Sequence, residues 1–148
     1  MTQWIAGISR GHNAGICLLK DGELVLNVEE ERLSREKYDG APLASMMLIK
    51  NYTDKLDYLA VAHTQILNNS VCTLEYCGED PYTAMARKMG LIERYSDNKN
   101  YYLAYQHPQV IDYGMIHHKL HAACAFYRSG FDNAVSVVVD GAGSFFDL

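Results

Sequence analysis

Residues 3–28, QWIAGISRGHNAGICLLKDGELVLNV, decide the fold, because they hold three apolar segments separated by short polar connections. Asp21-Gly22, between two of these segments, is a strong signal for a two-residue β-hairpin turn. Strands are predicted at residues 3–9, 14–20 and 23–28. The chain therefore opens with an antiparallel meander, whose first connection is the loop from Arg10 to Asn13.

After this meander the pattern changes to helices that alternate with single strands. Helices are predicted at residues 43–52, 81–95 and 117–129, and strands at residues 56–62, 109–113 and 134–140. The order β-β-β-α-β-α-β-α, with one more strand after it, indicates an α/β fold in which helices pack on a mixed sheet.

This order resembles the ribonuclease-H-like unit, which occurs twice in the actin, sugar-kinase and heat-shock ATPase superfamily. We expect residues 1–130 to form the first ribonuclease-H-like lobe and residues 131–148 to begin an incomplete second lobe. The strand predicted at residues 134–140 then has no neighbour within the sequence, and such an edge favours pairing with another chain.

Composition and charge restrict the function. The 148 residues are 49% hydrophobic and 21% charged, with a formal net charge of -5 and no dense basic run. This balance argues against general binding to nucleic acid. The sequence shows neither an apolar run long enough to cross a membrane nor a signal-peptide pattern at its start. The four cysteines form no CxxC pair, which favours reduced thiols and a cytoplasmic protein.

Two histidines on the last predicted helix, His117 and His121, are four residues apart. This spacing puts them on one face, where two imidazoles can share a metal ion. Asp140, at the end of the next strand, can complete the facial triad typical of non-haem iron. Each signal also has a structural explanation, because a histidine pair is more often exposed or hydrogen-bonded and Asp-Gly is common in turns. The adjacent His118 points to another face.

Two further features suggest a place for phosphate and for proton transfer. In Asp140-Gly141-Ala142-Gly143 the glycines let backbone N–H groups approach a phosphate closely. His12 lies in the first loop, where an imidazole suits a general base near neutral pH. An exposed loop histidine without a chemical role is the alternative for His12.

Together these residues resemble the O-carbamoyltransferase family of nodulation and antibiotic-tailoring enzymes. Three motifs carry the resemblance, in the family's order and along the whole chain. They are GISRGHNAGICLLKDGELV at residues 7–25, EEERLSREK at residues 29–37 and HHKLHAACAFYRSGFDNAVSVVVDGAG at residues 117–143. The last is very close to the family's His-His-x-x-His-Ala-Ala-x-Ala-Phe-Tyr signature with its following strand and Asp-Gly turn.

The resemblance implies an activity, cofactors and site residues. Carbamoyl phosphate and ATP give carbamoyl-adenylate, from which a carbamoyl group passes to the hydroxyl of a small molecule. By the same resemblance, the metal is a divalent ion, with Fe(2+) favoured, and the nucleotide phosphates lie along a glycine turn. The residues implied are His117, His121 and Asp140 as metal ligands, Gly141, Ala142 and Gly143 at the nucleotide, and His12 as candidate base.

The segment from Glu29 to Lys37 has two interpretations. The family pattern suggests that Arg32, Arg35 or Lys37 contacts an anionic phosphate. The alternative, which we favour, is a solvated helix start with salt bridges. The first loop also departs from the family, because Asn13 and Ala14 stand where Asp and Ser are usual.

The second half of the duplicated fold and the adenylate-forming domain have no counterpart in these 148 residues. We therefore expect the chain to need a partner chain or a C-terminal continuation, and not to carry out the full reaction alone. Two alternatives stay open. One is a relative of the tRNA threonylcarbamoyl-transfer protein, which has a similar histidine pair, and the other is a non-catalytic metal- or nucleotide-binding module.

Overall fold

The computed structural model of the 148-residue chain describes residues 2–10, 13–63, 81–93, 108–113 and 116–139. The elements are β1 (Trp4–Arg10), β2 (Gly15–Lys20), β3 (Glu23–Glu29), α1 (Glu31–Ser34), α2 (Leu43–Leu48), the 3-10 helix η1 (Ile49–Asn51), β4 (Tyr58–His63), α4 (Pro81–Lys88), β5 (Val110–Asp112) and α5 (His117–Ser129). Their order follows the one predicted as far as α5, with the short helix α1 as an addition.

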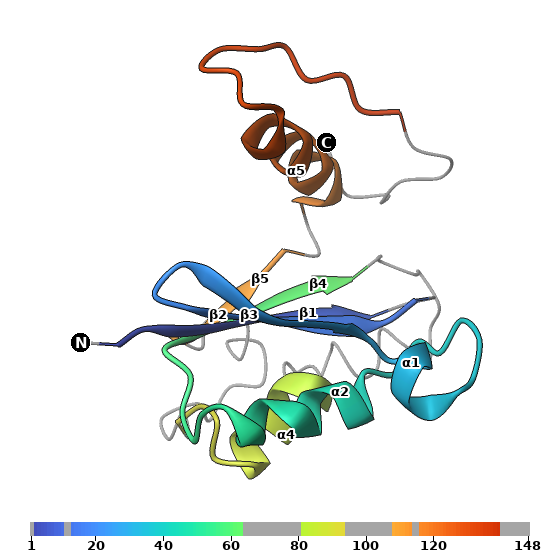
Figure 1. Ribbon diagram of the computed structural model, residues 1–148, viewed down its shortest axis with the longest axis vertical. Helices are drawn as coiled ribbons and strands as arrows, with labels where there is room; N and C mark the ends of the chain where they lie inside the picture. The colour runs from blue at the N-terminus through green and yellow to red at the C-terminus, as the bar shows by residue number, and fades with distance from the viewer. Residues whose placement is uncertain (1, 11–12, 64–80, 94–107, 114–115, 140–148) are drawn as a thin grey trace, which may run out of the picture.

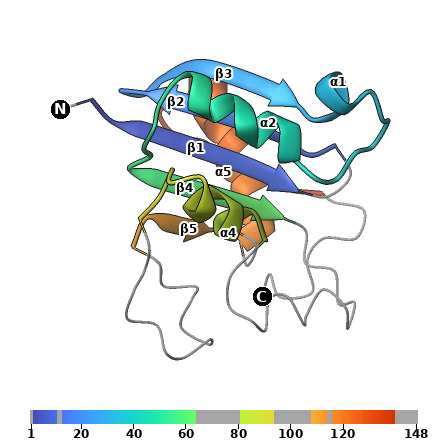
Figure 2. The ribbon, with the colours of Figure 1, turned by 90° about the horizontal axis from the view of Figure 1, so that it is seen from below.

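The five strands form one mixed sheet in the order β3-β2-β1-β4-β5. β1 pairs antiparallel with β2, and β2 with β3, whereas β1, β4 and β5 run parallel. Helices α2 and α4 cover one face of this sheet, and α5 lies on the other (Figure 1). Viewed from below, α2 and α4 are in front of the strands and α5 is behind them (Figure 2). The predicted mixed α/β architecture is confirmed.

The predicted hairpin turn has the backbone that it requires. Asp21 and Gly22 have φ angles of 52° and 87°, and two consecutive positive φ angles match the twist of antiparallel strands. The Asp21 carboxylate also accepts a hydrogen bond of 2.7 Å from the backbone N–H of Gln3, on the neighbouring strand end. The turn therefore sets the pairing of Lys20 with Glu23, and the register of β2 and β3 then shifts between Leu18 and Leu19.

The two faces of the sheet differ in side-chain size because strand residues alternate between them. Buried apolar residues on one face pack against residues from α2, η1 and the end of α4 to form the hydrophobic core. The strand residues of this core are Ala6, Ile8, Ile16, Leu18, Leu59 and Val61, and the helix side supplies Met46, Ile49, Ala86 and Leu91. The core therefore lies between the sheet and the helices below it in Figure 1.

Helix α4 is shorter than the predicted helix of residues 81–95, because Gly90 ends it. Gly90 has a φ of 73°, a left-handed conformation that suits glycine. The Leu91 N–H donates to the Ala86 carbonyl at 2.9 Å and the Gly90 N–H to the Arg87 carbonyl at 3.0 Å. This pair of bonds is a Schellman motif, which turns the chain and buries Leu91.

The strand predicted at residues 134–140 is wrong for the described residues, since 134–139 form no strand. The β-branched composition that predicted it is present, but no strand of the described sheet runs beside this segment. Val135, Val137 and Val139 are 91%, 82% and 91% exposed. Propensity alone does not make a strand when a hydrogen-bonding neighbour is lacking.

No helix within the described ranges has both the length and the apolar character needed to cross a membrane. Among the described residues, Cys17 and Cys124 form no disulfide, and Cys72 and Cys77 lie outside the described residues.

Gly7 and Cys17 supply a test of the sheet's close packing, because a Cβ at Gly7 would lie 2.7 Å from the Cys17 sulfur. We expect Gly7→Ala to lower the free energy of unfolding by about 1–3 kcal/mol, the usual cost of overpacking. The double variant with Cys17→Ala should recover about 1 kcal/mol or more of this loss. Urea unfolding followed by the fluorescence of Trp4, the single tryptophan, measures both.

Gly15→Ala is the contrasting variant. Its added Cβ would meet the backbone oxygen of Val28 at 2.6 Å, so Cys17→Ala should give it no recovery. Equal recovery in both backgrounds would contradict this explanation.

Candidate functional site

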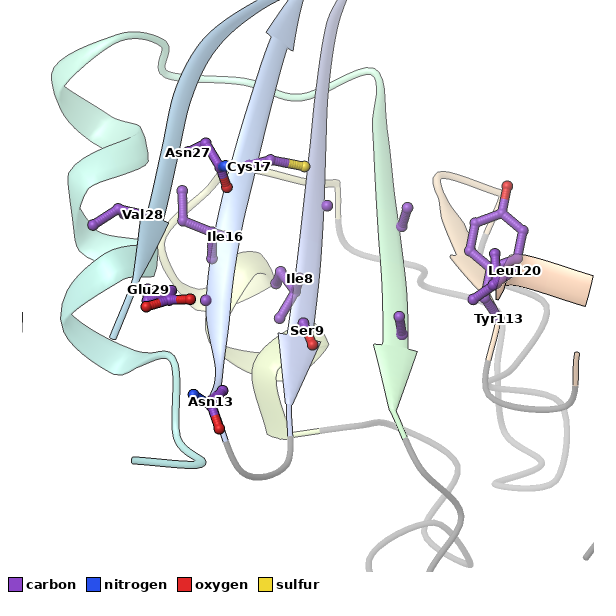
Figure 3. Close-up of a pocket in the computed structure, with 14 residues that line it drawn as sticks. Ile8, Ser9, Asn13, Ile16, Cys17, Asn27, Val28, Glu29, Tyr113 and Leu120 are labelled. Carbon is purple, nitrogen blue, oxygen red and sulfur yellow. The ribbon is translucent and has the colours of Figure 1, made fainter. Parts of the chain in front are cut away.

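A cavity of about 350 Å³ lies on the α5 side of the sheet. Leu120 of α5 and Tyr113, which follows β5, line it from one side, across from the strands (Figure 3). The cavity reaches Asn13, in the loop that joins β1 to β2. In open α/β sheets, ligands bind outside the carboxyl ends of the strands, and β1 and β4 both end toward this loop in the view of Figure 3.

Small residues of three neighbouring strands make the floor of this cavity. They are Gly7, Ser9, Gly15, Cys17, Ala60 and Ala62. The strand register places them in two adjacent rows across the sheet. Because none has a side chain longer than two heavy atoms, the floor is flat, and a planar molecule can lie close to it.

Polar side chains follow the β3 side of the cavity. In register, Asn27 lies beside Cys17 and Glu29 beside Gly15, and Figure 3 shows Asn27 and Cys17 next to each other. Glu29 is 3.4 Å from the guanidinium of Arg32, whose other carboxylate neighbour, Glu31, is at 3.5 Å. The Arg32 side chain is 70% exposed, so water competes strongly for these ion pairs.

Glu30 has a structural role that sequence reasoning missed. It is 2% exposed, and its carboxylate accepts hydrogen bonds from the backbone N–H groups of Ala44 at 2.7 Å and Ser45 at 2.8 Å. These groups belong to the first turn of α2, where N–H groups lack partners within the helix. The Glu30 carboxylate therefore caps α2 and fixes it to the end of β3.

The backbone of Glu30 links the end of β3 to the loop between β1 and β2. The Glu30 N–H donates to the Ala14 carbonyl at 2.8 Å, and the Ala14 N–H donates to the Asp39 carbonyl at 2.9 Å. Asp39 in turn accepts a hydrogen bond of 3.0 Å from the Ala41 N–H through its carboxylate. Ala14 is thus hydrogen-bonded both to the end of β3 and to the segment at Asp39.

The basic residues of the segment from Glu29 to Lys37 are exposed. Arg32 pairs with neighbouring glutamates, as the salt-bridge interpretation predicted. Arg35 ends α1 with a φ of 66°. The phosphate contact suggested for Arg32, Arg35 or Lys37 stays a prediction.

Helix α5 begins and ends where the sequence predicted, and Gly130 ends it with a φ of 74°. His121 is exposed and lines a groove of about 250 Å³ between α5 and residues 136–139. The Ser136 hydroxyl lies 3.5 Å from the Ala122 carbonyl across this groove. His117 is four residues earlier in the same helix, so this position lies one turn from His121 on the same face.

The remaining predicted site residues, His12, Asp140, Gly141, Ala142 and Gly143, lie outside the described residues. Within the described part of the chain, no group of three or more His, Cys, Asp or Glu residues is placed to hold a metal ion. The metal site, the nucleotide turn and the candidate base therefore stay predictions. What the structure adds is the groove at His121, which runs beside the residues that lead to Asp140.

Comparison with known proteins finds two distant relatives. The chain is 29% identical to the nodulation protein NolNO of Sinorhizobium fredii over 90% of its own length and 20% of the relative's. It is 30% identical to the uncharacterized protein sll1178 of Synechocystis over 94% of its own length and 25% of the relative's. The chain thus spans a fifth to a quarter of these relatives. No family profile and no solved structure matches it.

Glu30→Ala tests the cap of α2. Because this change leaves two backbone N–H groups near the start of α2 without an acceptor, we expect it to lower the free energy of unfolding by about 1.5–3 kcal/mol. Glu30→Gln keeps one acceptor oxygen and should lose less. Denaturant unfolding of the three proteins measures the difference.

Glu29→Ala is the matched control, one residue away in the same acidic run. Its side chain is half exposed, so the loss should stay below about 1 kcal/mol. A loss at Glu29 equal to that at Glu30 would contradict the assignment of the cap.

Proposed function

We propose that these residues form part of a carbamoyltransferase that passes a carbamoyl group from carbamoyl phosphate, by way of carbamoyl-adenylate, to the hydroxyl of a small molecule. The three motifs that resemble the O-carbamoyltransferases of nodulation support this proposal, and so does the match to a nodulation protein along 90% of the chain. Since the chain covers a fifth of that relative, we assign to it one part of the reaction.

The fold agrees with the proposal. On one side of β1 the mixed sheet continues through the antiparallel pair β2 and β3, and on the other side through β4 and β5, which run parallel to β1. With helices on both faces (Figure 1), this is the arrangement that we infer to be the ribonuclease-H-like lobe of the duplicated nucleotide-binding fold.

The groove at His121 is the observation on which the metal assignment rests. The exposed imidazole of His121 faces the same groove as Val139, the residue before Asp140. With His117 one helical turn away, two imidazoles and a carboxylate suit a divalent ion such as Fe(2+). The bound ion would polarise the phosphate of the adenylate.

The chain's own residues then have separate tasks in the transfer. The backbone N–H groups of Gly141, Ala142 and Gly143 would hold phosphate oxygens. His12 would accept the proton of the acceptor hydroxyl while that oxygen forms a bond to the carbamoyl carbon. The bond between this carbon and the phosphate oxygen breaks, and AMP leaves with the electron pair.

Metal content tests the assigned ligands. We expect the chain purified with Fe(2+) under reducing, oxygen-free conditions to retain iron, and His121→Ala and Asp140→Ala each to lower the retained iron by about tenfold or more, because each removes a ligand from a small set. His118→Ala is the matched control, since residue 118 lies on a different face of α5. Retention of iron by His121→Ala would exclude the site.

Carbamoyl transfer tests the reaction. The protein isolated from its own cells, with whatever chains accompany it, should transfer label from radiolabelled carbamoyl phosphate to small molecules when ATP is added. Asp140→Ala should abolish the transfer. Label on tRNA would instead favour the threonylcarbamoyl-transfer alternative, and retention of metal without any transfer would favour a non-catalytic module.

A further inference from the structure

The described residues that line the cavity between the sheet and α5 include a single charged side chain. Among the described residues that line it, none is Lys, Arg or His, and Glu29 is the one residue of a charged type. Phosphate sites in proteins use cations, helix N-termini or clustered backbone N–H groups to balance the charge of the ligand. The described walls of this cavity offer a carboxylate instead, which disfavours an anion.

The side chains around Glu29 leave the net charge at this wall of the cavity negative. Glu29 and Glu31 share the guanidinium of Arg32, at 3.4 and 3.5 Å, so the three side chains together carry one negative charge. Because Arg32 is largely exposed, its pairing with Glu29 is weak and a ligand cation can replace it.

The shape of the cavity also restricts the size and form of the ligand that can bind. Its floor of glycine, alanine, serine and cysteine is flat, and Leu120 and Tyr113 lie across from the strands (Figure 3). A volume of about 350 Å³ is at the small end of the usual range for ligand pockets and suits a compact ring. The amide of Asn27 can bond to ring hydroxyls, as both donor and acceptor.

We propose that this cavity binds the acceptor of the transfer reaction, and that the acceptor is a compact ring with hydroxyl groups that is neutral or positively charged. The role of this ring as the acceptor rests on the proposed function, whereas the binding of such a ring in the cavity does not. The anionic co-substrates, carbamoyl phosphate and the nucleotide, would bind outside this cavity.

Two small probes that differ in charge test the proposal. Trans-4-aminocyclohexanol combines an apolar ring, a hydroxyl and an ammonium group, whereas trans-4-hydroxycyclohexanecarboxylate has the same ring and hydroxyl with a negative charge. Ligand-observed NMR titration of the 148-residue chain should give a lower Kd for the ammonium probe, by about two- to fivefold, as expected for a half-exposed ion pair. Glu29→Gln should remove most of this preference. Equal or tighter binding of the carboxylate would overturn the charge assignment.

Location is tested with a variant that fills the cavity. Ala60→Leu places a larger side chain on the floor and should weaken the binding of both probes, with circular dichroism as the check that the chain folds. Unchanged binding by a folded Ala60→Leu would overturn the location.

Alkylation of Cys17 supplies a measurement on the unaltered chain. With the ammonium probe at about twice its Kd, occupancy should slow the reaction of Cys17 with iodoacetamide by about threefold. Cys124, on α5 and outside the described cavity lining, should react at an unchanged rate. Equal effects on both thiols, or none on Cys17 at a concentration where NMR shows binding, would exclude the cavity.

These measurements need neither metal nor ATP. If the probes bind as expected while His121→Ala retains iron and no carbamoyl transfer is found, the proposed function fails and the binding site stands. If transfer is found but the probes bind elsewhere or with the opposite preference, the function stands and the acceptor site fails.

Discussion

The buried carboxylate of Glu30 is the constraint on which the edge of this sheet depends. It satisfies the N–H groups of Ala44 and Ser45, and its own backbone N–H donates to Ala14. A single residue thereby joins the end of β3, the start of α2 and the first loop. Because a buried carboxylate is costly unless its hydrogen bonds are made, these three segments have one favourable arrangement.

That arrangement lets the two faces of the sheet serve different purposes. Glu30 follows β3 and its side chain belongs to the α2 side, whereas the preceding residue, Glu29, lines the cavity on the α5 side. One acidic run therefore supplies a structural cap and a cavity wall, because successive strand residues point to opposite faces. Ile8 and Ile16 likewise fill the core, whereas Gly7 and Gly15 open the floor of the cavity.

Local signals predicted the parts of the fold that local chemistry determines. Asp21-Gly22 fixed the hairpin, and the alanine-rich run after His117 gave a helix with the predicted ends. Gly90 marks the end of α4, but this signal was hidden in the sequence because helical composition continues on both sides of it. The strand predicted at residues 134–140 is absent from the described residues 134–139 for a different reason. A strand needs a hydrogen-bonded neighbour, and composition does not reveal whether one is present.

The sequence shows which residue types the candidate site contains, but it does not show which of them are buried or what lies next to them. An i, i+4 histidine pair can be read from the sequence, but which of three consecutive glutamates becomes buried depends on the twist of β3 and the approach of α2. The small residues of β1 and β2 were visible as a pattern, and their alternation with isoleucine was the available signal for an open face. The partner across the cavity, Leu120, comes from a helix more than a hundred residues later.

Helix α5 connects the two halves of the proposed chemistry. Leu120 lines the cavity and His121, the next residue, lines the groove with residues 136–139. In Figure 1 the helix lies between the sheet and this segment. Successive residues on a helix point about 100° apart, so one helix can present an acceptor wall on one side and a metal ligand on another.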